Sequence, residues 1–345
     1  HHISQQLPID MSLQVTIPNE WEKIAPVNIG YTAGIEATKV SPQWIEKSTL
    51  MDRIITISEH SKNVYQNTVY EGVIEQTGEK AEFRTHTPIE VVHYPVKSLD
   101  AEELNIDLDY DFNFLTVAQF GPRKNMINTV NWFLQEFGDD EVGLILKTNI
   151  ANCSTTDSLN TQAKIATILS NYPNAKCKVY LLHGDLTLAQ MNSLYTNPKV
   201  KAYVTHTHGE GFGIPIFEAA YHGVPVIAPA WSGQNDFLHA HTKTGKRKKA
   251  KLRALFSKVE YTIGQVPPEA VWQGVIQPDA GWCYPTQQSA KKTMREVYEN
   301  YSKHTKVAKQ LQKHLLENFT KENQYAKFAD AVYTQNQDAW LSEIS

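Results

Sequence analysis

Two glutamates, Glu210 and Glu218, stand eight positions apart in the stretch HGEGFGIPIFEAAYHG at residues 208–223. A carboxylate repels a phosphate group but accepts hydrogen bonds from hydroxyl groups. We therefore expect the pair to bind hydroxyl groups of a ligand. The alternative is that Glu210 is a solvated loop charge and that Glu218 stabilises a helix start through the helix dipole.

The segments around the two glutamates indicate a phosphate between them. An apolar run at 201–206 predicts a strand, and Pro215 and Gly223 mark the start and end of a short helix. Free N–H groups at a helix N-terminus favour an anion, and Gly211 and Gly213 would let the backbone approach it closely. Phosphates flanked by two polyols describe a nucleotide sugar.

The pattern from residue 113 onward predicts a Rossmann-like domain. Short valine-, isoleucine- and leucine-rich runs alternate with helical segments such as 126–137 and 186–195. Such alternation is typical of a parallel sheet covered on both faces. The expected strands are 113–120, 142–147, 178–184, 201–206 and 224–229. A dinucleotide fingerprint is a weaker interpretation, because the GEGFG run lacks the spacing of the final glycine and follows a late strand.

The first hundred residues repeat this theme more faintly, with strands expected at 26–32 and 53–58 and helices near 41–51 and 60–70. Only two or three strands are predicted there, so this domain is expected to be incomplete or reduced. From about residue 287 the chain is expected to be helical. The predicted division is an N-terminal domain at 1–100, a C-terminal domain at 101–325, and a helix at 326–345 that returns to the N-terminal domain.

The stretch HGEGFGIPIFEAAYHGVPVIAP at 208–229 resembles the signature of retaining GT-B glycosyltransferases of family GT4. The resemblance extends to FLTVAQFGPRKN at 114–125, and residues 29–63 are similar to the later part of the family's acceptor-side domain. Further similar segments lie at 144–149, 183–195 and 231–238. The fold that this implies is GT-B, with two Rossmann-like α/β domains facing a cleft.

The same resemblance implies roles for individual residues. Glu210 would contact the donor sugar, Glu218 the ribose, and Lys124 with Arg123 the diphosphate. Catalysis would then depend on Glu210, Lys124 and Arg123. The other residues implied in donor binding are Gly211, Phe212, Gly213, Gln119, Gly121, Lys147, His183, Gly184 and Leu186.

The chain departs from the family pattern in two places. Gln119 stands where many members have an arginine, which leaves Arg123 as a substitute phosphate ligand. The strand and glycine-rich loop that begin the family's first domain have no counterpart before HHISQQ, and His1 and His2 are either native or a tag remnant.

The family resemblance implies a metal-independent, retaining transfer of a hexose to an unknown hydroxyl acceptor. The departing phosphate would help to deprotonate the acceptor, so neither a protein nucleophile nor a cofactor is expected. The alternatives are a GT-B-like scaffold subunit that holds a nucleotide without efficient transfer and, less favoured, a nucleotide-sugar epimerase.

The composition bears on nucleic-acid binding, on the redox compartment and on membrane insertion. A net charge of -4 in 345 residues gives no general attraction for nucleic acid. Cys153, Cys177 and Cys283 lack zinc or redox spacing, which favours a reduced, cytoplasmic location. No apolar run has the roughly 20 residues needed to cross a bilayer, and no signal peptide is visible.

For four other features we prefer a structural interpretation to a functional one. The basic run at 243–253 is expected to be a solvated loop, with a patch for an anionic acceptor or a membrane surface as the alternative. The DLDYD sequence at 107–111 is expected to be a solvated linker rather than a metal motif. His206 and His208 lack a third metal ligand, and Trp272 and Trp282 are expected to pack rather than to stack on a sugar.

Overall fold

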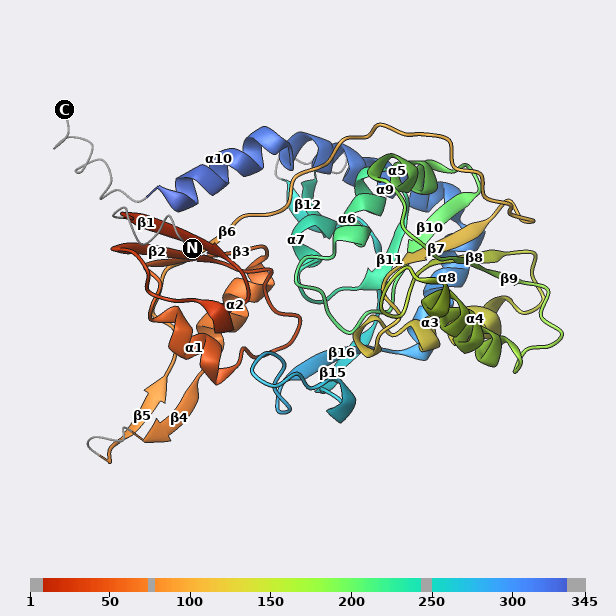
Figure 1. The fold of residues 1–345 in the computed structure, drawn as a ribbon. Helices are drawn as coiled ribbons and strands as arrows, with labels where there is room; N and C mark the ends of the chain where they lie inside the picture. Colours follow the sequence, from red (N-terminus) through yellow and green to blue (C-terminus); the bar gives the residue numbers. More distant parts are fainter. Residues whose placement is uncertain (1–8, 74–77, 243–249, 334–345) are drawn as a thin grey trace.

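A six-stranded parallel sheet forms the centre of the C-terminal domain in the computed structural model, which describes residues 9–73, 78–242 and 250–333 (Figure 1). Its order is β14-β11-β10-β7-β8-β9, and every neighbouring pair is parallel. The strands are β7 (Asn113–Val117), β8 (Gly143–Lys147), β9 (Lys178–Leu182), β10 (Val200–Val204), β11 (Val226–Pro229) and β14 (Ser257–Val259). Five of them match the expected strands, and the expected α/β arrangement around a parallel sheet is confirmed.

Helices cover both faces of this sheet, because successive side chains of each strand point to opposite sides and both sides are apolar. In β7, Phe114 belongs to one buried cluster with Phe133, whereas its neighbour Leu115 belongs to another with Phe217. The helices of this domain are α3 (Met126–Phe137), α4 (Thr155–Leu169), α5 (Leu188–Thr196), α6 (Ile214–Tyr221), α7 (Asn235–Leu238), α8 (Gln287–Glu299) and α9 (Tyr301–Asn318), with the short helix η2 (Pro122–Lys124).

The N-terminal domain has a four-stranded parallel sheet in the order β1-β2-β3-β6. Its elements are β1 (Met11–Val15), η1 (Pro18–Glu20), β2 (Val27–Tyr31), α1 (Pro42–Ser48), β3 (Arg53–Thr56), α2 (Glu59–Asn67), β4 (Tyr70–Val73), β5 (Lys80–Phe83) and β6 (Ile89–Val91). The expectation of two or three strands was therefore wrong. Strand β1 was missed because it is half exposed and lacks a continuous apolar run, with Val15 67% exposed. The β4–β5 hairpin is short and mostly exposed.

Two antiparallel hairpins extend the C-terminal domain: β12 (His239–Thr242) with β13 (Lys251–Ala254), and β15 (Tyr261–Gln265) with β16 (Gly281–Pro285). The short helix η3 (Pro268–Ala270) lies between β15 and β16. This second hairpin joins the core of the N-terminal domain, where Trp282 is buried in one cluster with Trp21 and Trp44. Trp282 is thus a packing residue, whereas Trp272 is 58% exposed.

The last described helix, α10 (Lys321–Val332), crosses from the C-terminal domain to the N-terminal sheet (Figure 1). Phe328 contacts the ring of Tyr31, and Arg53 donates a hydrogen bond to the carbonyl of Ala331 over 2.9 Å. The segment that returns to the N-terminal domain begins at Lys321, and residues 334–345 lie outside the described part.

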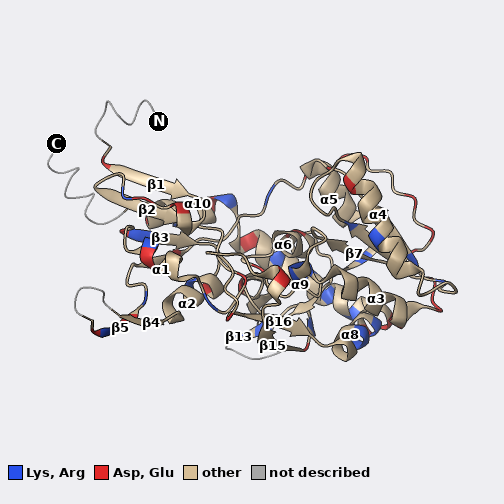
Figure 2. Cartoon of the chain, turned by 60° about the horizontal axis from the view of Figure 1, so that its bottom comes forward, with Lys and Arg blue, Asp and Glu red and all other residues tan. Residues whose placement is uncertain are grey.

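The linker near residue 100 lies along α5 rather than free in solvent. Asn192 donates hydrogen bonds to the carbonyls of Ser98 and Asp100 over 2.9 and 2.6 Å, and Thr187 bonds to Glu102. Lysines, arginines, aspartates and glutamates are interspersed over both domains (Figure 2). Most of the basic run at 243–253 lies outside the described residues. No helix within the described residues is long and apolar enough to cross a membrane.

Candidate active site

The central strands β7 and β10 are neighbours in the sheet, although three α-helices and two strands separate them in sequence. From β7 the chain continues to β8 and β9 on one side, and from β10 it continues to β11 and β14 on the other. Ligands of open parallel sheets bind at such a switch point, outside the carboxyl ends of the strands. The loops that follow β7 and β10 carry Arg123, Lys124 and Glu210.

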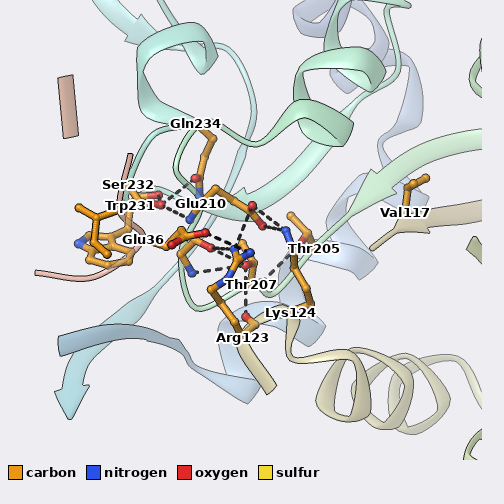
Figure 3. A network of polar contacts seen from close by, with 12 residues as sticks. Glu36, Val117, Arg123, Lys124, Thr205, Thr207, Glu210, Trp231, Ser232 and Gln234 are labelled. Carbon is orange, nitrogen blue, oxygen red and sulfur yellow. Dashed lines mark hydrogen bonds and ion pairs between the residues drawn. The ribbon is translucent and has the colours of Figure 1, made fainter. Parts of the chain in front are cut away.

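These three residues form one charged cluster (Figure 3). The ammonium Nζ of Lys124 lies 2.6 and 2.7 Å from the two carboxylate oxygens of Glu210. Arg123 Nη1 lies 3.2 Å from Glu210 Oε2 and donates a hydrogen bond to the carbonyl of Gly209 over 2.6 Å. Glu210 is thus in direct contact across the switch point with Lys124 and Arg123, which precede it by 86 and 87 positions in the sequence.

The Glu210 carboxylate remains ionised although it is buried, with 7% of the residue exposed. Burial alone would raise its pKa, but the nearby charges of Lys124 and Arg123 outweigh burial and hold the pKa below the usual glutamate value. The pKa of Arg123 is raised in return: burial opposes its charge, and Glu210 and Glu36 more than compensate. The cluster therefore presents fixed charges at neutral pH.

The segment at 231–234 fixes the backbone of Glu210. Ser232 Oγ accepts a hydrogen bond from the Glu210 N–H over 2.9 Å, and the Gly233 N–H donates to the Glu210 carbonyl over 3.0 Å. Ser232 has φ 67°, a left-handed conformation that is uncommon for serine. Gln234 bonds to the same hydroxyl over 2.9 Å. A strained turn therefore orients the loop that carries Glu210.

The loop at 211–213 leads into helix α6. Gly213 has φ 96°, which glycine adopts without strain. Within the described residues, the backbone N–H groups of Gly211, Phe212 and Gly213 have no hydrogen-bond acceptor. Three donors at the N-terminus of an eight-residue helix can bind an anion.

Gly211 lies against the N-terminal domain, and Phe212 lies in the core. A Cβ atom on Gly211 would lie 2.5 Å from the carbonyl oxygen of Ala33, so the glycine lets the two domains approach closely, and its part in donor binding stays a prediction. The Phe212 ring is 2% exposed and packs against Tyr94 and Phe237. Among the groups of Phe212, its N–H is therefore the one suited to a ligand.

Glu218 lies in α6 and is buried, with 8% exposed. Lys97, from the linker, donates a hydrogen bond to Glu218 Oε1 over 3.0 Å, and Tyr195 donates to Oε2 over 3.2 Å. Neither partner was predicted, because Lys97 and Tyr195 lie outside the motif that contains Glu218. Lys97 is about half exposed, so a ligand can displace it.

The other predicted donor-binding residues lie at the ends of β7, β8 and β9. Gln119 donates to the carbonyl of Ile150 over 2.8 Å, and Lys147 donates to the carbonyl of Gly184. His183 lies 2.9 Å from Asp157, a carboxylate that also accepts three backbone N–H bonds. Space is open where a Cβ would extend from Gly121 or Gly184, and Leu186 packs at the edge of a core cluster. Donor binding by these residues stays a prediction.

Glu36 of the N-terminal domain completes the charged cluster, and this position was not predicted from the sequence. Its Oε1 lies 3.2 Å from Arg123 Nη2. A Cβ on Gly209 would lie 2.3 Å from the Glu36 carbonyl oxygen, so the two domains touch here through their backbones. The only signal for Glu36 was its position inside the 29–63 segment.

The two motifs considered for metal binding have other contacts. Asp109 pairs with Lys178 over 2.9 Å, and Asp111 is exposed. His206 is buried against Trp132, and His208 stacks on Trp282. Across the ranges that the structure describes, no three histidine, cysteine, aspartate or glutamate side chains form a metal-binding group.

Neither a protein-family model nor a curated protein sequence matches the chain. Solved structures do. A glycosyltransferase from Rickettsia africae matches with TM-score 0.62 and 11% identity over 95% of this chain and 77% of that one. HepE of Anabaena, solved with UDP and glucose, matches with TM-score 0.56 and 12% identity over 89% and 72%.

A point mutant of TarM from S. aureus, solved with fondaparinux, α-GlcNAc-glycerol and UDP, matches with TM-score 0.52 and 11% identity. The match covers 89% of this chain and 51% of TarM, so the chain spans about half the length of TarM. At these identities the similarity establishes the architecture. The chain has the GT-B fold of these glycosyltransferases.

Proposed function

We propose that this chain is a glycosyltransferase that binds a nucleoside diphosphate sugar at the β7–β10 switch point. The observation that carries the proposal is the contact of Lys124 and Arg123 with Glu210, beside the free backbone N–H groups of residues 211–213 that lead into α6. Cations and N–H donors suit a diphosphate, and a carboxylate suits sugar hydroxyls. One cluster thus offers both kinds of ligand group that a nucleotide sugar requires.

The positive groups would stabilise the departing diphosphate. Cleavage of the bond between the sugar and the diphosphate leaves negative charge on the phosphate oxygens, and fixed cations near that charge lower the barrier. Lys124 and Arg123 supply full charges, and the N–H groups of Gly211, Phe212 and Gly213 supply partial ones. Donor binding would draw Lys124 and Arg123 partly away from Glu210.

Glu210 would then accept hydrogen bonds from hydroxyl groups of the sugar, and Glu218 from the ribose. Glu218 is preformed for this task, because Lys97 and Tyr195 already hold it as a hydrogen-bond acceptor. We further propose that a hexose is transferred with retention of configuration to a hydroxyl acceptor and without a metal ion. The family resemblance of residues 208–229 supports retention, and the fixed cations supply charge that a metal ion would otherwise provide.

The proposal is tested by titrating the protein with UDP in a calorimeter, since HepE and the TarM mutant were solved with UDP. Lys124→Met should weaken UDP binding by about 10- to 100-fold, the range for loss of one charge-assisted hydrogen bond. Release of UDP from UDP-glucose, UDP-galactose and UDP-N-acetylglucosamine, with and without EDTA, tests transfer to water. UDP binding without release from any donor would favour the scaffold alternative, and absence of binding to any nucleoside diphosphate would refute both.

A further inference from the structure

We infer that Glu36 is a substrate-contacting residue that the N-terminal domain contributes to this site: it yields Arg123 to the donor diphosphate and then accepts a hydrogen bond from a hydroxyl group of the bound sugar. This inference rests on the proposed function. It assigns the N-terminal domain a direct part in binding the donor.

Two carboxylates, those of Glu36 and Glu210, share the Arg123 guanidinium. The Glu36 and Glu210 carboxylates reach the Arg123 guanidinium from different domains, each with a distance of 3.2 Å (Figure 3). Glu210 also accepts hydrogen bonds from a second cation, Lys124, at both of its carboxylate oxygens. In the described part of the molecule, Arg123 is the cation that Glu36 contacts, through Oε1 alone. Glu36 is therefore the carboxylate that loses its cation when Arg123 turns to a phosphate.

The backbone of Glu36 is held in place by its surroundings. The loop that carries it is fixed by a hydrogen bond from the Ile35 N–H to Ser61 Oγ over 3.0 Å and by the left-handed Gly34 at φ 79°. The carbonyl of Glu36 lies against Gly209 so closely that no side chain fits between them. The backbone of Glu36 therefore stays beside the site when Arg123 turns away, which keeps the carboxylate within the length of one side chain.

A carboxylate that stays beside a bound diphosphate needs a new partner. An unpaired charge in a partly buried site is unfavourable, and two like charges repel. The Glu36 side chain is 26% exposed, and its Oε2 has no hydrogen-bond donor among the described residues. Hydroxyl groups are the donors that a sugar brings to the site. The exchange of a guanidinium for a hydroxyl follows from these constraints.

We expect substitution of Glu36 to raise the affinity for UDP and to lower the rate of UDP release from a nucleotide sugar. Glu36→Ala frees Arg123 and removes a negative charge near the phosphates, so UDP, which has no hexose, should bind about 3- to 10-fold more tightly. Release of UDP from the best nucleotide sugar should fall about 10-fold or more, because a contact with the sugar is lost. Lys124→Met should weaken UDP binding, so the two variants move it in opposite directions.

Glu36→Gln keeps a hydrogen-bond acceptor without the charge and should also tighten UDP binding, while losing less of the release rate than Glu36→Ala. Glu46→Gln, on the exposed face of α1 in the same domain, is the matched control. Melting temperatures identify a variant that has lost its fold, in which case Glu36→Gln decides. The inference is overturned if removing the charge weakens UDP binding or leaves UDP release unchanged. Absence of binding of any nucleoside diphosphate to the unaltered protein would instead refute the proposed function.

Discussion

Lys124 Nζ lies within 2.7 Å of both carboxylate oxygens of Glu210, although the residues belong to loops after different strands of the C-terminal sheet. This contact joins the group suited to a phosphate with the group suited to a sugar, and each neutralises the other. A donor would have to separate them partly, so substitutions on the two sides should affect binding and turnover differently.

Glu210→Gln should lower the rate of UDP release from a nucleotide sugar by about 10- to 100-fold, the range for a hydrogen bond to a charged group. UDP itself should bind at least as tightly as before, because the substitution frees Lys124 and Arg123. Steady-state kinetics and calorimetry measure the two effects. Glu141→Gln, at an exposed position after α3, is the control. Unchanged UDP release would show that Glu210 does not contact the sugar.

Glu218→Gln should distinguish the ribose from the diphosphate. UDP binding should weaken about 10-fold through loss of a charged hydrogen-bond acceptor, whereas binding of pyrophosphate, which has no ribose, should change little. Competition experiments with both probes measure the difference. Equal weakening for the two would mean that Glu218 acts through the shape of α6 instead.

Gly209→Ala should destabilise the contact between the domains. Its Cβ would lie 2.3 Å from the Glu36 carbonyl oxygen. The backbone must shift to relieve this overlap, which should lower the free energy of unfolding by about 1–3 kcal/mol. Thermal unfolding should show the loss. Gly121→Ala is the matched control, because a Cβ there meets no atom within 4 Å and its φ of -125° suits alanine. Similar melting temperatures for both variants would contradict the close contact.

His206 predicts a dependence of stability on pH. It is fully buried, and burial lowers its pKa to about 3. Below the unfolded value of about 6.5 the unfolded chain binds a proton that the folded protein excludes, so stability is present above pH 6.5 and is lost as the pH falls toward 3.

The loss attributable to His206 should reach about 1.4 kcal/mol per pH unit in this window. Urea unfolding of the protein and of His206→Gln at several pH values checks it. The variant is expected to be less stable at pH 7 but to lose less stability on acidification. Parallel pH profiles for the two proteins would argue against a neutral buried His206.

The pattern of apolar residues was enough to predict five of the six strands of the C-terminal sheet, all but β14, and the position of the charged residues on its loops. Strands such as β8 and β10 are continuous apolar runs because helices cover both faces, and such runs are visible without a structure. The carboxyl ends of parallel strands meet at one edge, which already placed Glu210 and Lys124 on the same side of the sheet.

Residues of the N-terminal domain and of the linker also lie at that edge of the sheet, and only the tertiary structure reveals them. Glu36 reaches Arg123, Ala33 fills the space beside Gly211, and Lys97 reaches Glu218. These partners come from segments 87 to 178 residues distant in sequence, as their numbering shows. Hydrophobic periodicity encodes which face of a local element is buried, but it carries no information about which loops of another domain lie against it. Those contacts depend on how the two domains and α10 pack together.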